Sequence, residues 1–138
     1  MRVLLDTNIL VSASRSDQGT PYLAFVRATT SPNQGIVCDQ NLDELRRVYI
    51  RKFSHKLGLL ERFLAFALPV LEIVHTPVAN MEEESKIRDA SDRPILRAAI
   101  AAKADILITG DKDFLESGVT VPKVMTAVEF LEASSQEC

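Results

Sequence analysis

The sequence predicts an α/β fold in which a parallel sheet of four or five strands is covered by helices. Short apolar runs bounded by polar turns alternate with longer segments whose apolar residues recur at helical spacing. This alternation is typical of β-α-β units, which align their strands in parallel and place their helices on the faces of the sheet. The chain has 138 residues and no internal repeat, linker or low-complexity segment. We therefore expect residues 1–138 to form one domain.

Two strands and four helices are expected in the first half of the chain. The apolar runs predict strands at residues 3–5 and 35–38. Apolar residues at helical spacing predict helices at residues 8–14, around residues 22–26, from Asp39 onward and at residues 55–68. Asp39 is a plausible N-cap for the third of these helices. Pro69 should end the fourth, because proline cannot donate the helical hydrogen bond.

Up to three further strands are expected in the second half. They lie at residues 70–74, 106–108 and 122–125, and the last is the optional fifth strand. The stretch 76–89 is polar and should be mostly loop. A helix should begin near Asp92, with Pro94 in its first turn, where proline is tolerated. Thr126 and Glu129 match a capping box, in which each side chain accepts the other's backbone N–H, and they predict the start of the last helix.

The composition limits the class of protein. No apolar run approaches the roughly 20 residues of a membrane span, and the acid at position 6 comes too early for a signal peptide. We therefore expect a cytoplasmic protein without membrane contact. Two cysteines make no disulfide framework. Cys38 lies in an apolar stretch and should be a buried thiol, whereas Cys138 should be exposed and incidental.

Four acids from separate segments should meet at one edge of the sheet. Asp6 follows the first strand and Asp111 follows the fourth. Glu44 lies in the helix after the second strand, and Asp92 opens the helix before the fourth. Functional groups of parallel α/β sheets collect at the carboxyl ends of the strands. Neighbouring carboxylates repel one another unless a cation compensates, and Mg²⁺ is commonly held by a few carboxylates. The pattern therefore predicts a divalent metal site.

Each of these acids also has a purely structural interpretation. Asp6 could only cap the helix that follows it. Glu44 comes three residues after Asn41 and could complete a capping box or face solvent, and periodicity alone favours this reading. Asp92 fits a first-turn acid favoured by the helix dipole, and Asp111 could belong to a turn. It is the joint placement of the acids that favours a site.

Three segments match the motifs of a known family. The first strand runs into Asp6-Thr7-Asn8, and the pair Glu44-Leu45 lies in the third predicted helix. The most specific segment runs from Ile87 to Leu96 and continues from Ala104 to Leu115. In these motifs the sequence resembles PIN-domain ribonucleases, in particular the toxin components of bacterial and archaeal toxin–antitoxin pairs. The resemblance covers nearly the whole chain. It implies a three-layer α/β/α PIN-like nuclease domain with a central parallel sheet of four or five strands.

The resemblance also implies a metal-dependent endoribonuclease with a defined set of site residues. It implies that four acids bind Mg²⁺ or Mn²⁺: Asp6, Glu44, Asp92 and Asp111. We expect Asp6 and Asp111 to hold the principal ion. Asn8 and Thr109 would help to hold this cluster in place. Asp89 and Asp113 are close enough to be additional ligands. Ser91 stands where many relatives have a further acid, so the ligand set of this segment stays open.

The same resemblance suggests the partners of the protein. RNA would be the substrate, a cognate antitoxin would bind the toxin, and a homodimer is plausible by family analogy alone. The net charge of −3 argues weakly against nucleic-acid binding. However, the four site acids contribute −4 of charge, so the rest of the chain is not acidic. No acid occurs from Leu45 to Leu60, where five basic residues make an RNA contact as plausible as a merely solvated helix: Arg46, Arg47, Arg51, Lys52 and Lys56. Four of them do not share one helical face, so some must only face solvent: Arg46, Arg47, Arg51 and Lys52.

Other functions were weighed against this one. A non-catalytic PIN-fold module that binds RNA or a protein would usually have lost a site acid, and all four are present. A receiver domain needs an aspartate at the end of its third strand, where His75-Thr76-Pro77 stands. A haloacid-dehalogenase-like phosphatase needs a second aspartate two residues after Asp6, where Asn8 stands. The nuclease is therefore the preferred hypothesis.

Overall fold

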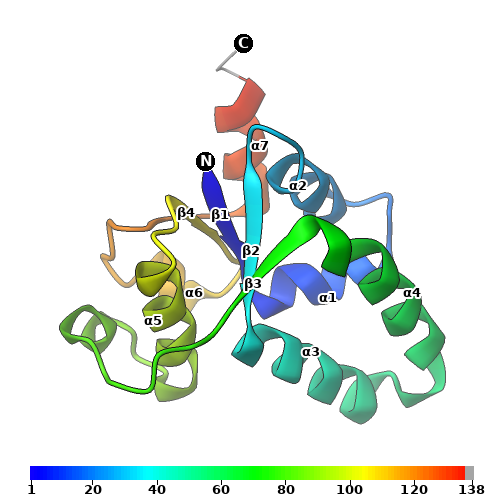
Figure 1. The fold of residues 1–138 in the computed structure, drawn as a ribbon, viewed down its shortest axis with the longest axis horizontal. Helices are drawn as coiled ribbons and strands as arrows, with labels where there is room; N and C mark the ends of the chain where they lie inside the picture. The colour runs from blue at the N-terminus through cyan, green and yellow to red at the C-terminus, as the bar shows by residue number, and fades with distance from the viewer. Residues whose placement is uncertain (136–138) are drawn as a thin grey trace.

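The computed structural model describes residues 1–135 and contains one five-stranded sheet. Its strands, in chain order, are β1 (Arg2–Leu5), β2 (Gln34–Cys38), β3 (Leu71–Val74), β4 (Ile106–Ile108) and β5 (Lys123–Met125). Their spatial order is β3-β2-β1-β4-β5, and every neighbouring pair is parallel. The predicted α/β class is thus confirmed, with the optional fifth strand present (Figure 1).

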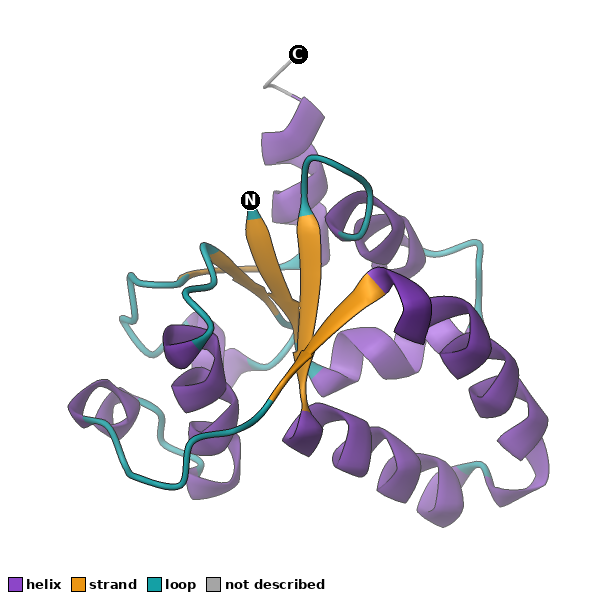
Figure 2. Ribbon diagram, in the orientation of Figure 1, coloured by secondary structure: helices purple, strands orange, loops and turns teal. Residues whose placement is uncertain are grey.

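Helices cover both faces of the sheet and make three layers (Figures 1 and 2). The seven α-helices of residues 1–135 are α1 (Thr7–Arg15), α2 (Thr20–Ala28), α3 (Asp39–Lys52), α4 (Leu57–Ala67), α5 (Arg93–Ala101), α6 (Lys112–Leu115) and α7 (Ala127–Ser135). Four short 3₁₀ helices accompany them: η1 (Ser54–Lys56), η2 (Leu68–Val70), η3 (Glu82–Lys86) and η4 (Ala90–Asp92). Helices α1 to α4 and α7 pack on one face, and α5 and α6 pack on the other.

Alternate residues of each strand supply the two hydrophobic layers. Val3 and Leu5 of β1 are buried among α1 to α4, whereas Leu4 between them packs against α5. This is the two-residue period of a strand buried on both faces. On the larger side, the rings of Phe25 and Phe63 pack with centroids 5.2 Å apart. Each buried side chain of this size contributes about 1.5–3 kcal/mol to stability, so the sheet edge that carries the polar residues rests on a well-packed frame.

The structure corrects two details of the expected element boundaries, one at a helix and one at a strand. Cys38, not Asp39, is the N-cap of α3: the Cys38 backbone N–H donates to Asn41 Oδ1 at 3.0 Å. The Asp39 side chain instead accepts the backbone N–H of Thr76, also at 3.0 Å, and so anchors the end of β3. The third strand begins one residue later than expected, because Val70 belongs to the 3₁₀ turn that contains Pro69.

Other details of the sequence prediction are confirmed. Thr126 and Glu129 form the expected capping box, with hydrogen bonds of 2.9 and 3.1 Å. Cys38 is completely buried, and Cys138 lies outside the described residues. No helix within residues 1–135 is both long enough and apolar enough to cross a lipid bilayer.

The connection from β3 to α5, residues 75–92, is called the strap here. It is mostly loop, as expected, but η3 lies within it and a buried ion pair fastens it to α5. The Arg97 guanidinium binds both carboxylate oxygens of Glu84, at 2.9 and 3.0 Å, and donates to the carbonyl oxygen of Pro77 at 2.7 Å. The two charged side chains are only 11% and 8% exposed. The strap is therefore held against the helix that follows Asp92.

Candidate active site

The sheet order brings together two strand ends that are far apart in the sequence. Strands β1 and β4 are neighbours at the centre of the sheet, where the strand order reverses, and Leu5 is paired with Ile108. The Asp6 backbone N–H donates to the Ile108 carbonyl oxygen at 3.0 Å, so Asp6 and Thr109 lie side by side. Crevices at such reversal points are the usual ligand sites of open parallel sheets.

Asp6 is held in a fixed orientation by three donors. Its Oδ1 accepts the Thr7 backbone N–H at 2.8 Å, as in a helix N-cap. Its Oδ2 accepts the Thr109 hydroxyl at 2.8 Å and the Asn8 amide at 3.2 Å. The residue is only 4% exposed. The capping role and the site role suggested by the sequence are thus compatible in one side chain.

Asn8 and Thr109 link the ends of β1 and β4. The Gly110 backbone N–H donates to Asn8 Oδ1 at 3.0 Å, and the Asp111 backbone N–H donates to Thr109 Oγ1 at 3.0 Å. The Thr109 hydroxyl therefore connects Asp6 to the backbone of Asp111. Both residues occupy the positions that supporting residues of the acidic cluster would need.

Glu44 is joined to the cluster through a residue that the sequence did not single out. The Thr7 hydroxyl donates to Glu44 Oε2 at 2.9 Å and accepts the Asn41 side-chain amide at 3.2 Å. Since Asn41 completes the cap at Cys38, the alternative capping box between Asn41 and Glu44 is wrong. In the sequence, Thr7 stands only as the middle residue of the Asp6-Thr7-Asn8 motif and Asn41 only as a possible capping residue, so neither was expected to hold Glu44.

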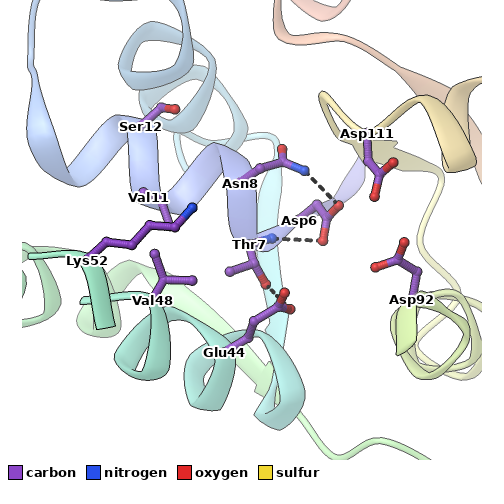
Figure 3. A pocket seen from close by; sticks show the side chains of 10 residues that line it. All are labelled: Asp6, Thr7, Asn8, Val11, Ser12, Glu44, Val48, Lys52, Asp92 and Asp111. Atoms are coloured by element: carbon purple, nitrogen blue, oxygen red, sulfur yellow. Dashed lines mark hydrogen bonds between the residues drawn. The ribbon is translucent and has the colours of Figure 1, made fainter. Parts of the chain in front are cut away.

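Asp92 and Asp111 face each other across the site (Figure 3). Asp111 is the N-cap of α6, and its Oδ1 accepts the Asp113 backbone N–H at 2.9 Å. Asp92 precedes α5 but makes no capping hydrogen bond. Its Oδ2 is buried and has no hydrogen-bond partner among the described residues. A buried carboxylate oxygen without a donor is costly, so this site requires a proton or a cation.

All four predicted acids line one pocket. Figure 3 shows Asp6, Asp92 and Asp111 at one end, Glu44 beneath them and Lys52 at the other end. Five further residues complete the lining: Thr7, Asn8, Val11, Ser12 and Val48. The structure therefore brings the four acids together, from segments as distant in the sequence as β1 and α6.

The acids of this pocket carry uncompensated negative charge. Burial raises the pKa of Asp6 to about 6, although hydrogen bonds from Thr109 and Thr7 oppose the shift. Burial also raises the pKa of Asp92, and hydrogen bonding to Asp111 and the charge of Asp111 raise it further. Without a bound cation, the protein reduces this repulsion by retaining protons.

The donor set fits a hard divalent cation. Carboxylate oxygens are the ligands that Mg²⁺ and Mn²⁺ prefer, and the unpartnered Oδ2 of Asp92 is a free donor within the cluster. Within residues 1–135, one set of at least three acids has ligand oxygens that all lie within 4.8 Å of one another, and it is formed by Asp89, Asp92 and Asp113. There, however, Arg88 already binds Asp113 at 2.9 Å, and Asp89 accepts the Ser91 backbone N–H at 3.0 Å. The inner four acids are thus the less compensated set.

Comparisons with known proteins agree with this fold. A family model described as a PIN domain matches residues 2–113. The chain belongs to the PIN-domain family. A chain in the crystal structure of VapBC2 from Rickettsia felis, bound to a DNA fragment from their promoter, is similar with a TM-score of 0.66. It is 21% identical, and the likeness covers 91% of this chain and 97% of that one, which supports the fold. No curated protein sequence matches this chain.

The basic residues of α3 and η1 divide into three groups in this PIN domain. Lys52 lines the carboxylate pocket. Arg47 and Arg51 line an adjoining groove between α3 and α5, and Arg47 also pairs with Asp43 at 3.2 Å. The remaining two candidates line neither of these hollows: Arg46 and Lys56. The expectation that the four basic residues of α3 would not share one face therefore agrees with the structure.

The raised pKa values predict how the stability of the metal-free PIN domain depends on pH. Asp6 and Asp92 hold protons in the folded state that the unfolded chain has already released above about pH 4. The free energy of unfolding should therefore fall as the pH rises through about 6, the pKa of Asp6. Acids with lowered pKa values change the free energy of unfolding with pH only below about pH 4.

Thermal unfolding in EDTA at about pH 5 and about pH 8 measures this effect. We expect a lower Tm at the higher pH, and a smaller difference in Asp92→Asn or in the presence of Mg²⁺. A Tm in EDTA that is equal or higher at the higher pH would show that the acids are not mutually destabilising.

Proposed function

We propose that this PIN domain is a metal-dependent endoribonuclease that hydrolyses RNA phosphodiester bonds. One observation carries the proposal: the buried Oδ2 of Asp92 has no hydrogen-bond partner among the described residues, and it lies in a pocket with three further acids. A smaller number of charges would serve any structural purpose equally well. Each additional carboxylate in the pocket repels the others. A Mg²⁺ or Mn²⁺ ion would offset that repulsion and provide a reason for the arrangement.

The residues of the pocket divide the work in this proposal. Asp6 and Asp111 would hold the principal ion, with Asp92 and Glu44 completing its site or holding a second one. When bound, such an ion lowers the pKa of water and stabilises charge on the phosphoryl group. Thr109 and Asn8 keep Asp6 oriented through their hydrogen bonds to its Oδ2. A carboxylate of the cluster accepts the proton of the attacking water.

We further propose that the protein is the toxin of a toxin–antitoxin pair. The motifs from Ile87 to Leu115 resemble those of such toxins, and the fold is similar to that in the VapBC2 structure, where the chains are bound to promoter DNA. A cognate antitoxin would then mask the acidic pocket or α3, and the toxin would act on RNA in the cytoplasm. Expression of the protein alone should slow growth, and a homodimer fits the same analogy.

RNA cleavage with and without divalent ions tests the proposed activity. The wild type should cleave RNA in Mn²⁺ or Mg²⁺ and not in EDTA. Calorimetric titration with Mn²⁺ should show binding that Asp6→Asn weakens strongly. If the wild type neither cleaves RNA nor binds Mn²⁺, the chain is instead a non-catalytic PIN-fold module that binds RNA or a protein.

The supporting residue Thr109 provides a milder test of the same site. Thr109→Val removes the hydroxyl that donates to Asp6 and accepts the Asp111 backbone N–H. Loss of a residue that orients a metal ligand typically costs roughly 10- to 100-fold in metal affinity, and we expect a loss of that size for Mn²⁺ in calorimetry. Thr120→Val, at an exposed position, is the control. Equal affinities of the two variants for Mn²⁺ would show that Thr109 does not support the metal site.

A further inference from the structure

Thr7, the first residue of α1, contacts two of the four acids in the carboxylate pocket. Its backbone N–H donates to Asp6 Oδ1 at 2.8 Å, and its hydroxyl donates to Glu44 Oε2 at 2.9 Å (Figure 3). Among residues 1–135, Thr7 is the one hydrogen-bond donor to the Glu44 carboxylate, which makes no ion pair there. The orientation of Glu44 therefore depends on a single hydroxyl group.

The direction of the hydrogen bond from Thr7 is set by Asn41. The Cys38 backbone N–H can only donate, and it binds Asn41 Oδ1 at 3.0 Å. This contact turns the amide of Asn41 so that its Nδ2 donates to Thr7 Oγ1 at 3.2 Å. A hydroxyl group carries one proton, and a donor already points at the Thr7 oxygen. The Thr7 proton is therefore directed to Glu44.

Burial prevents this chain of donors from reversing. Asn41 and Cys38 are completely buried, and Thr7 is only 4% exposed. If the amide of Asn41 turned over, its NH₂ group would face the Cys38 N–H, and a buried N–H that loses its acceptor is costly. Capping of α3 accounts for the contact of Asn41 Oδ1 alone. The second contact, from Nδ2 to Thr7, serves the side of the residue that faces the acids.

We propose that Asn41 and Thr7 are positioning residues that determine how Glu44 enters the metal site. The Thr7 hydroxyl holds Glu44 Oε2. Glu44 Oε1, which accepts no hydrogen bond among the described residues, is the oxygen available to a divalent ion. Asn41 acts through Thr7 and touches neither the ion nor the substrate. The inference rests on the proposed metal-dependent function and adds two residues outside the acidic cluster.

Calorimetric titration with Mn²⁺ tests the role of the Thr7 hydroxyl. Thr7→Val removes the hydroxyl at nearly constant volume, and we expect the roughly 10- to 100-fold loss of metal affinity that is typical when a group that orients a metal ligand is removed. Thr7→Ser keeps the hydroxyl and should bind Mn²⁺ within about three-fold of the wild type. Thr120→Val, at an exposed position, is the control for the same chemical change. Equal affinities of Thr7→Val and Thr120→Val would overturn the inference.

Asn41→Asp separates the positioning role from the helix cap. The variant keeps an oxygen that can accept the Cys38 N–H, but at about pH 8 it has no proton to donate to Thr7. The Thr7 hydroxyl is then drawn toward the new carboxylate and away from Glu44. Mn²⁺ affinity should fall about five-fold, the size expected for one hydrogen bond, although the added negative charge alone would raise it. An equal or higher affinity would show that Asn41 does not position Glu44.

A double-mutant cycle shows whether Thr7 acts through Glu44. In a Glu44→Gln background the ligand is already lost, so Thr7→Val should lower the Mn²⁺ affinity no further. A residue that only stabilises the fold would lower the affinity by the same factor in both backgrounds, and that result would contradict the inference. Thermal unfolding shows that each variant is folded at the temperature of the titration.

Crystal structures in EDTA test the orientation of Glu44 without an ion. Its carboxylate should keep its place in the wild type and in Thr7→Ser, and it should move or lose its electron density in Thr7→Val. If the wild type binds no Mn²⁺, the proposed function fails, but a displaced Glu44 in Thr7→Val would still support its orientation by Thr7. An unmoved carboxylate in Thr7→Val would overturn the inference even if the wild type binds Mn²⁺ and cleaves RNA.

Discussion

Alanine at Asp111 or at Asp6 is expected to lower the rate of RNA cleavage at least about 100-fold, the size of effect seen when one group that stabilises developing charge is removed. Asp6 is fixed by three donors and Asp111 by its helix-capping position, so both carboxylates are held at the site without a bound ion. The two residues also terminate adjacent strands. Loss of either should therefore weaken the same ion.

Cleavage by the purified variants at saturating Mn²⁺ measures this loss, and thermal unfolding checks that they are folded. Asp6→Ala also removes a helix cap, which costs about 1 kcal/mol, so Asp6→Asn is the better folded control. Asp17→Asn, at an exposed position between α1 and α2, should remain within two-fold of the wild type, the scale of ordinary surface effects of about 0.5 kcal/mol. Unchanged activity in both alanine variants would refute the mechanism.

Removal of the guanidinium in Arg97→Ala should lower the free energy of unfolding by about 3 kcal/mol. Arg97 is 11% exposed and binds Glu84, the Pro77 carbonyl oxygen and the Asn80 side chain. The variant leaves the Glu84 carboxylate, 8% exposed, without its counter-charge. Such a loss exceeds the net value of the pair itself, because an unpaired buried charge costs more than a paired one contributes.

Denaturant unfolding of a double-mutant cycle tests this explanation. The cycle combines Glu84→Leu with Arg97→Met, which removes both charges. We expect the double variant to lose less stability than the two single variants together, with an interaction free energy of about 1–3 kcal/mol. Arg62→Ala, at an exposed position on α4, should change stability by less than about 0.5 kcal/mol. If the loss of stability in the double variant equals the sum of the losses in the two single variants, the two side chains are not coupled. Because the strap leads into Asp89 and Asp92, Arg97→Ala should also weaken Mn²⁺ binding.

The sequence predicts the site best where local rules are sufficient. Asp6 and Asp111 each follow a short apolar strand, and the carboxyl ends of parallel strands meet at one edge, so their place at the same edge of the sheet follows from fold class alone. The capping box at Thr126 is local as well, and it is present as predicted. These features depend on neighbours within a few residues or on the direction of the strands.

Features that depend on contacts between distant segments were not predictable from pattern. Glu44 reaches the site through the Thr7 hydroxyl, 37 residues earlier in the chain, while helical periodicity alone favoured a structural role for it. Arg97 reads as a polar position of an amphipathic helix, yet the strap folds back over it and buries its guanidinium. In both cases tertiary packing determines the role of the side chain.

The division of the basic residues follows the same rule. Their spacing shows that Arg46, Arg51 and Lys52 point in different directions around α3, but not which direction leads to the carboxylates. Only the placement of α3 against α1 and α5 shows that Lys52 enters the pocket and Arg51 the adjoining groove.

The position of a bound Mn²⁺ ion tests the central claim most directly. We expect crystals soaked in Mn²⁺ to show an anomalous difference peak within coordination distance of Asp6, Asp92 and Asp111, and the same soak of Asp6→Asn to show a much weaker peak. No peak at these carboxylates under saturating Mn²⁺, or a peak confined to another part of the surface, would contradict the assignment of this cluster as the metal centre.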